Sequence, residues 1–255
     1  HWRKQFDIPL VAITGSNGKT TVKEMLAAIL REAAGSDESG LATSGNFNND
    51  IGMPLTLLKL RETHRYAVIE MGMNHANEID YLTRIARPDV ALVNNASGAH
   101  LQGLGSVEGV ARAKGEIFSG LKSNGTAVIN ADDAYAVLWR NLASTNRILD
   151  FALEYAAAVK GSWSAQGYGG MLHARTPAGD LRVKLQVPGE HNARNALAAA
   201  TAALALDIPL ASIAKALEGF SGVPGRMQRK QALHGATLID DTYNANPASM
   251  HAALE

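Results

Sequence analysis

Short apolar runs recur along the first part of the chain, and each is followed by a polar turn and by apolar residues at helical spacing. The clearest run is Leu10–Ile13, after which Thr14–Thr21 is polar and a helical pattern continues to Leu30. Uninterrupted apolar runs are typical of parallel strands buried on both faces. Further strands are expected at 41–44, 66–71, 89–94, 126–130 and 147–151, and further helices at 54–60, 77–86, 106–121 and 133–142. This alternation predicts a three-layer α/β fold, in which helices flank a mostly parallel sheet.

The pattern changes in the second part of the chain. Between Ala157 and Val187, short alternating runs are separated by glycines, which indicates two or three antiparallel strands at an edge of the sheet. Helices are then expected at 191–206 and 209–217, followed by a pair of strands at 227–233 and 237–240. We expect a domain boundary near Val223, because residues 223–255 are too few to bury a core of their own.

Composition agrees with a globular enzyme of 255 residues, of which 46% are hydrophobic. Lys and Arg number 24 and so do Asp and Glu, so no net charge draws the chain to nucleic acid or to an anionic membrane. The absence of cysteine excludes disulfides and thiolate zinc sites. The longest apolar stretch, Ala196–Leu206, is too short to span a bilayer, and no secretory leader is recognisable. Since the chain begins with His1 and not with Met, we expect that an upstream segment is missing.

The polar turn after the first strand has the composition of a phosphate-binding loop. Its residues are Gly15, Ser16, Asn17, Gly18, Lys19, Thr20 and Thr21. Glycines let backbone N–H groups point inward, a helix N-terminus favours negative charge, and Lys19 adds a positive charge. We expect Thr20 to offer its hydroxyl to Mg²⁺. The general P-loop pattern is only partly met, because Ile13 stands where its first glycine is expected. The turn therefore predicts a P-loop-type site for nucleotide phosphates.

Motifs along most of the chain resemble those of the Mur ligases of peptidoglycan synthesis. They read TGSNGKTT, GNFNNDIGMPLTLL, VIEMGMNHANEI, NNASGAHLQGLGSVEGVARAKGEIFSGL, NADD, PGEHNARNALAA, VPGR and DDTYNANPASM. The resemblance implies that residues 1–222 form a central ATP-binding domain and that residues 223–255 are the truncated start of a Rossmann-like C-terminal domain. In this family an N-terminal domain holds the UDP of the substrate, and it is expected to be absent here.

The activity that the resemblance implies is ATP-dependent amide bond formation. A peptide carboxylate is activated by ATP as an acyl phosphate, which an amine then attacks. The loop Gly45–Pro54 is most similar to that of the family members that add D-Ala-D-Ala to UDP-N-acetylmuramoyl-tripeptide. The implied cofactors are ATP and Mg²⁺, and the implied partners are these two small-molecule substrates. Nucleic acid binding and membrane insertion are not expected. We expect the protein to be a monomer in the bacterial cytoplasm.

Four residues are expected to bind metal, and Lys19 to neutralise the β- and γ-phosphates. Glu70 ends a predicted strand, where parallel sheets place ligand sites, and a carboxylate suits a hard cation. The resemblance assigns the metal ions to Thr20, Glu70, His100 and Lys114. It further implies that Lys114 is carbamylated by CO₂, which a buried lysine with a lowered pKa would permit, because the neutral amine is the nucleophile.

The resemblance assigns further residues to nucleotide and substrate. Asn195 would bind the adenine with His191 nearby, although an Asn at a helix start can also be only a cap. Arg226 would reach the γ-phosphate when the domains close, and Asp241 would contact the ribose. The muramoyl-peptide would meet Thr43, Ser44, Asn46, Asn48 and Asn49.

Three other functions are compatible with part of the sequence. A diaminopimelate- or lysine-adding Mur ligase, or a folylpolyglutamate synthase, would share Lys19, Glu70, His100 and Lys114 but differ at 45–54 and 241–247. A P-loop switch or motor ATPase would hydrolyse ATP without an amine acceptor and would leave both of those motifs unexplained. The 255-residue chain, taken by itself, could also act only as a nucleotide-binding module. The sequence does not indicate the third residue of the acceptor tripeptide.

Overall fold

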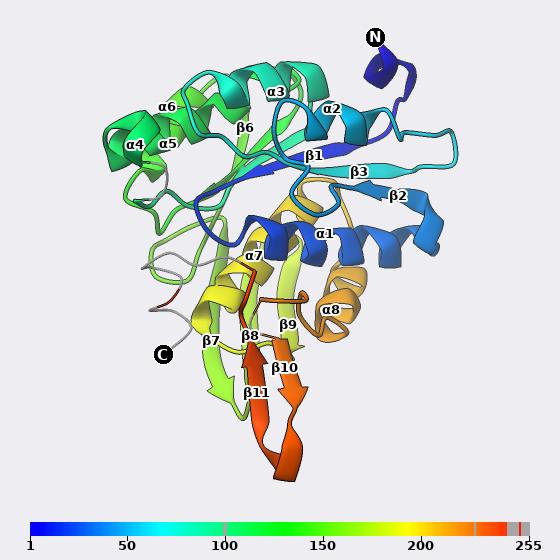
Figure 1. The fold of residues 1–255 in the computed structure, drawn as a ribbon, viewed down its shortest axis with the longest axis vertical. Helices are drawn as coiled ribbons and strands as arrows, with labels where there is room; N and C mark the ends of the chain where they lie inside the picture. Colours follow the sequence, from blue (N-terminus) through cyan, green and yellow to red (C-terminus); the bar gives the residue numbers. More distant parts are fainter. Residues whose placement is uncertain (99–100, 227, 244–249, 251–255) are drawn as a thin grey trace.

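The computed structural model describes residues 1–98, 101–226, 228–243 and 250, and its centre is a nine-stranded sheet (Figure 1). The strands are β1 (Leu10–Thr14), β2 (Gly40–Ala42), β3 (Tyr66–Glu70), β4 (Val90–Val93), β5 (Thr126–Asn130), β6 (Arg147–Ala152), β7 (Val159–Gln166), β8 (Gly169–Thr176) and β9 (Gly179–Leu185). Their spatial order is β2-β3-β1-β4-β5-β6-β7-β8-β9. All neighbours from β2 to β7 are parallel, whereas β8 is antiparallel to both of its neighbours, β7 and β9. The predicted α/β fold with an antiparallel edge is confirmed.

Helices cover both faces of this sheet. They are α1 (Lys19–Ala34), α2 (Gly52–Leu57), α3 (Glu78–Ala86), α4 (Leu101–Leu104), α5 (Val107–Gly115), α6 (Ala136–Leu142), α7 (Glu190–Leu204) and α8 (Leu210–Glu218). Short 3₁₀ helices span Trp2–Gln5, Asp37–Ser39, Glu116–Gly120 and Leu233–Gly235. Figure 1 shows α1, α7 and α8 on one face of the sheet, and α2, α3, α5 and α6 on the other. The arrangement has the three predicted layers.

The strand β1 explains why the apolar run is uninterrupted. Val11 and Ile13 belong to the core under α1, α7 and α8, whereas Leu10 and Ala12 belong to the core on the opposite face. All four residues have no exposed surface. Because successive side chains of a strand point to opposite faces, a strand covered on both faces needs apolar residues at every position.

The predicted helix at 106–121 is wrong after Gly115, where the chain tightens into the 3₁₀ helix Glu116–Gly120. This turn packs directly on α3, and a Cβ at Gly120 would lie 2.3 Å from the carbonyl carbon of Thr83. The Thr83 hydroxyl donates to the carbonyl of Ile117 at 2.8 Å. The carboxylate of Glu116 accepts backbone N–H groups at the start of α3. Close packing between the two segments therefore overrides the helical pattern.

The predicted pair of strands is present as β10 (Gln228–Gln231) and β11 (Thr237–Asp240), which form a separate two-stranded antiparallel sheet. In Figure 1 this hairpin projects from the side that carries α8. The helix predicted after Pro247 lies almost entirely outside the described residues. Among the described helices, none has both the length and the apolar character that crossing a bilayer would require.

Candidate functional site

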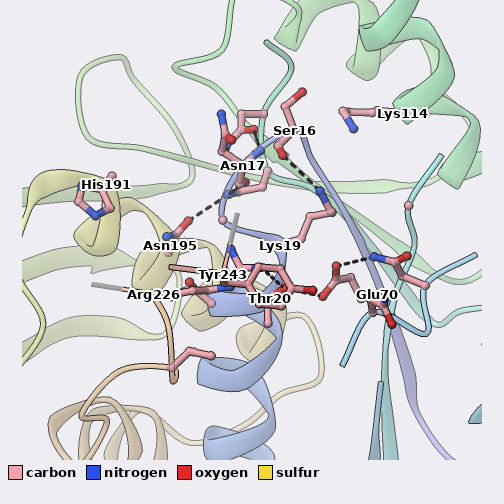
Figure 2. Close-up of a pocket in the computed structure, with 18 of the residues that line it drawn as sticks. Ser16, Asn17, Lys19, Thr20, Glu70, Lys114, His191, Asn195, Arg226 and Tyr243 are labelled. Atoms are coloured by element: carbon pink, nitrogen blue, oxygen red, sulfur yellow. Dashed lines mark hydrogen bonds between the residues drawn. The ribbon is translucent and has the colours of Figure 1, made fainter. Parts of the chain in front are cut away.

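A cavity of about 850 Å³ lies where β1, β3 and β4 end (Figure 2). Its walls come from the phosphate loop, the loop at 46–50, the end of β3, α5, the start of α7 and the segment 220–243. The carboxyl ends of parallel strands are where open α/β sheets bind ligands. The predicted site residues that line it are Ser16, Asn17, Gly18, Lys19, Thr20, Thr21, Asn46, Asn48, Asn49, Glu70, Lys114, His191, Asn195, Arg226 and Asp241.

The phosphate loop ends in a left-handed residue, Gly18, with φ of 78°, immediately before α1 begins. A Cβ at Gly18 would lie 2.3 Å from Oδ1 of Asn195, so both the backbone conformation and the packing require glycine. The Lys19 ammonium reaches back to donate to the carbonyls of Gly15 at 2.7 Å and Ser16 at 3.2 Å. Burial lowers the pKa of Lys19, which the Glu70 carboxylate opposes. The loop thus gathers positive charge at a helix N-terminus, as anion binding requires.

Two asparagines after β4 hold the phosphate loop, and neither was predicted to have a role. Asn95 accepts the N–H of Ser16 on its carbonyl at 3.0 Å and that of Asn17 on its side-chain Oδ1 at 2.8 Å. Asn94 donates to the carbonyl of Asn17 and to Oδ1 of Asn195, both at 3.0 Å. Adjacent amides directly after a buried strand were the available sequence signal. Asn195 lies in the second turn of α7 and faces this network, so the alternative that it only caps the helix is wrong.

Glu70 joins three elements of the site. Its carboxylate accepts the Thr20 hydroxyl at 2.9 Å on one oxygen and the Asn48 side-chain amide at 2.9 Å on the other. Arg226 donates to the same Thr20 hydroxyl at 3.1 Å. Hydroxyl and carboxylate oxygens are the donors that Mg²⁺ prefers, so Thr20 and Glu70 fit such an ion. Within the described ranges, no group of three or more His, Cys, Asp or Glu side chains could hold a metal, and His100 lies outside those ranges.

Lys114 projects from α5 toward the cavity and is only 1% exposed (Figure 2). Burial holds the pKa of its ammonium well below the ordinary value of 10.5, and the nearby charge of Lys19 lowers it further. The structure thus meets the condition that carbamylation requires, a buried lysine with a lowered pKa. Both favour the neutral amine, which is the form that reacts with CO₂. The carbamate itself stays a prediction.

The far wall of the cavity comes from the segment around Arg226. Its guanidinium lies over the ring of Tyr243, 4.2 Å from the ring centroid, which is a cation–π contact. Tyr243 was not singled out in the sequence, although it lies two residues after Asp241. Arg226 thus already faces Thr20 and the phosphate loop.

The loop after β2 is only partly directed at the cavity. Asn46, Asn48 and Asn49 line it, together with Asp50, which was not predicted. Thr43 and Ser44 are not among the described lining residues. Thr43 is 1% exposed, and its hydroxyl accepts the backbone N–H of Glu70 at 2.9 Å. Thr43 therefore supports the position of Glu70.

A glycine loop between a parallel strand and a helix, with a lysine, a hydroxyl and a carboxylate around it, defines a P-loop-type α/β domain. The model of the Mur ligase middle domain matches residues 13–203. The chain therefore belongs to the Mur ligase family.

Individual relatives are similar over nearly the whole chain. The UDP-N-acetylmuramoyl-tripeptide–D-alanyl-D-alanine ligase of Haemophilus influenzae is 46% identical over 99% of this chain and 55% of its own length. The crystal structure of MurF from Acinetobacter baumannii is 40% identical, with a TM-score of 0.92 over 98% of this chain and 54% of that one. MurF ligase from Thermotoga maritima in complex with ADP is 28% identical, with a TM-score of 0.84 over 99% of this chain and 58% of that one. The chain thus spans about half the length of these relatives.

Proposed function

We propose that this chain is the ATP-binding part of a ligase that joins D-Ala-D-Ala to UDP-N-acetylmuramoyl-tripeptide. The observation that carries the proposal is the pair of hydrogen bonds at Glu70, from Thr20 of the phosphate-binding helix and from Asn48 of the neighbouring loop. A ligase must bring the γ-phosphate of ATP to a substrate carboxylate. The two hydrogen bonds bring the phosphate-binding helix next to the loop that is proposed to bind the peptide substrate. The 46% identity to the Haemophilus influenzae ligase supports the choice of substrates.

The chemistry follows from charge and position. Lys19 and the backbone N–H groups of the loop hold the β- and γ-phosphates, and Arg226 supplies a second cation beside Thr20. The substrate carboxylate attacks the γ-phosphorus and ADP leaves. The amine of D-Ala-D-Ala then attacks the acyl carbon, and inorganic phosphate leaves. Phosphoryl transfer depends mainly on positioning and on neutralising charge, which this set of residues supplies.

Thr20 and Glu70 would hold Mg²⁺, with His100 and a carbamylated Lys114 as further ligands. When bound, Mg²⁺ supplies additional neutralisation of phosphate charge. Asn195 and His191 would bind the adenine, Asp241 the ribose, and the loop with Asn46, Asn48 and Asn49 the muramoyl-peptide, with Thr43 and Ser44 at its start.

We also infer that residues 1–222 form the central domain and that residues 223–255 begin the domain that closes over it. The separate β10–β11 sheet supports this division. A monomer in the bacterial cytoplasm is the expected form.

The test is phosphate release by the full-length protein with ATP, Mg²⁺ and UDP-N-acetylmuramoyl-tripeptide. The reactions contain D-Ala-D-Ala, diaminopimelate, lysine or no amine. We expect release to require both the nucleotide peptide and D-Ala-D-Ala, and to yield the pentapeptide. Release that is equally fast without an acceptor would instead identify an ATPase, and release with diaminopimelate or lysine a different Mur ligase.

The carbamate on Lys114 has its own test. Lys114→Ala should inactivate the ligase, and added short carboxylic acids should restore part of the activity by supplying the missing anion. Asn95→Ala, which alters the phosphate loop instead, should not respond to the acids. Full activity of Lys114→Ala, or no restoration, would contradict the carbamate.

A further inference from the structure

One turn after the phosphate loop, α1 carries a second buried lysine that the proposed chemistry does not use. Lys23 is 1% exposed and is not among the described residues that line the cavity. Its ammonium donates to the carbonyl of Thr43 at 2.6 Å and pairs with the carboxylate of Glu24 at 2.7 Å. A buried charge is costly unless it is paired and hydrogen-bonded, so these contacts determine where the Lys23 ammonium lies.

Thr43 connects Lys23 to Glu70. Its carbonyl accepts from Lys23, and its hydroxyl accepts the backbone N–H of Glu70 at 2.9 Å. The carboxylate of Glu70 in turn accepts from Thr20, which lies on the same helix as Lys23. Asn48, five residues after Thr43, donates to the other carboxylate oxygen. Helix α1 therefore holds Glu70 twice, directly through Thr20 and indirectly through Lys23 and Thr43.

We infer that Lys23 is a positioning residue, which fixes Glu70 and the 43–48 loop against the phosphate-binding helix. The inference rests on the proposed function, in which Glu70 serves the metal and the loop serves the peptide substrate. Without the ammonium, the Thr43 carbonyl loses its donor in a buried setting, so the loop must shift or leave a polar atom unpaired. Partners behind a metal ligand typically contribute about 10- to 100-fold to metal affinity.

The first test is Lys23→Met in the full-length protein, with Lys160→Met as the matched control. Lys160 also donates its ammonium to a backbone carbonyl, that of Leu153, but it lies at the antiparallel end of the sheet. The readout is the Kd of a fluorescent ADP analogue with and without Mg²⁺. We expect Lys23→Met to reduce the Mg²⁺-dependent gain in affinity about tenfold. The Kd without Mg²⁺ should stay at the wild-type value, because the phosphate loop itself is unchanged.

The second test removes the intermediate contact and remains informative if Lys23→Met does not fold. Thr43→Val deletes the hydroxyl that accepts from Glu70, whereas Thr43→Ser retains it. We expect Thr43→Val to lose the Mg²⁺-dependent gain and Thr43→Ser to keep it. Both Thr43→Val and Lys23→Met should also raise the KM for UDP-N-acetylmuramoyl-tripeptide, which Lys160→Met should leave unchanged.

The outcomes separate this inference from the proposed function. A lower melting temperature with an unaltered Mg²⁺-dependent gain would reduce Lys23 to a structural role and overturn the inference. An unaltered gain in Thr43→Val would do the same. If the wild-type protein binds ADP with the Mg²⁺-dependent gain in affinity but fails to use D-Ala-D-Ala, that result would contradict the proposed substrates. The ADP measurements would still test the role of Lys23.

Discussion

The two ends of the central sheet are built differently. The parallel strands β1, β3, β4 and β5 are buried at every position, because helices cover both of their faces. At the other end, β9 alternates between exposed and buried residues, so one of its faces is open. The phosphate loop and Asn94 follow strands of the parallel end, and Glu70 is the last residue of such a strand. None of the described residues that line the cavity belongs to β7, β8 or β9.

The difference follows from strand direction. Because parallel strands run in the same direction, their carboxyl ends lie side by side along the sheet, so polar residues that are far apart in sequence meet there. In an antiparallel hairpin neighbouring strands run in opposite directions, so their carboxyl ends do not lie together and polar residues do not converge in this way. The antiparallel end still contributes core, because Leu172, Val183 and Leu185 pack beneath α7 and α8. We therefore expect substitutions at the parallel end to change function, and those at the antiparallel end to change only stability.

The largest effect is expected at the phosphate loop. Lys19→Ala should reduce ATP turnover of the full-length protein about 10³-fold or more, because it removes a cation aimed at the phosphate that is transferred. Steady-state phosphate release measures it. Lys215→Ala is the control, since Lys215 is an exposed lysine of α8 that pairs with Glu32. Wild-type turnover in Lys19→Ala would contradict the assignment of the loop.

A pair of leucines compares the two ends directly. Leu172 in β8 and Leu92 in β4 are both fully buried in the same core, so each change to Ala should cost about 3 kcal/mol of unfolding free energy. Only Leu92→Ala should also raise the KM for ATP, because β4 leads directly into Asn94 and Asn95. Denaturant unfolding and ATP kinetics measure the two effects. An equal rise in the KM for ATP in Leu172→Ala would show that the antiparallel end also affects ATP binding.

We expect Lys114 to make the stability of the protein depend on pH. Its pKa is lowered in the folded protein, so above that folded pKa and below 10.5 the unfolded chain binds more protons at this site. Wild-type stability should therefore rise with pH in that window, by up to about 1.4 kcal/mol per pH unit. Lys114→Met removes this contribution. It should be more stable than wild type near neutral pH, by a margin that shrinks toward pH 10.5.

Denaturant unfolding in CO₂-depleted buffer, between about pH 6 and about pH 9, measures this difference. Lys215→Met serves as the control, because the Lys215 side chain is 73% exposed and its removal should not change the slope. Parallel stability curves for wild type and Lys114→Met would show that Lys114 does not titrate differently in the two states.

The smallest effect is expected on the open face of the antiparallel end. His173 is an exposed residue of β8, and His173→Ala should change the unfolding free energy by no more than about 0.5 kcal/mol. The KM for ATP should not change. A measurable rise in the KM for ATP would show that a change on this face affects the cavity. It would contradict the expectation that substitutions at the antiparallel end change only stability.

Features that depend on neighbouring residues could be predicted from the sequence. The strand types follow from period-two or continuous apolar patterns, and the phosphate loop from its glycines next to Lys19 and Thr20. The antiparallel edge was predicted because its alternation and glycines are local signals. Glu70 could be placed at the site from its position at the end of a strand, since a parallel topology determines where that end lies.

Features that depend on contacts between distant segments were decided only by the tertiary structure. Lys114 has the sequence setting of a solvated helical lysine, yet the packing of α5 against the sheet buries it and lowers its pKa. Thr43 is separated by 27 residues from Glu70, whose N–H its hydroxyl accepts. The hydrogen bond between Asn94 and Asn195 spans 101 residues. No local pattern encodes such contacts, because burial and hydrogen-bond partners are set by which elements the sheet brings together.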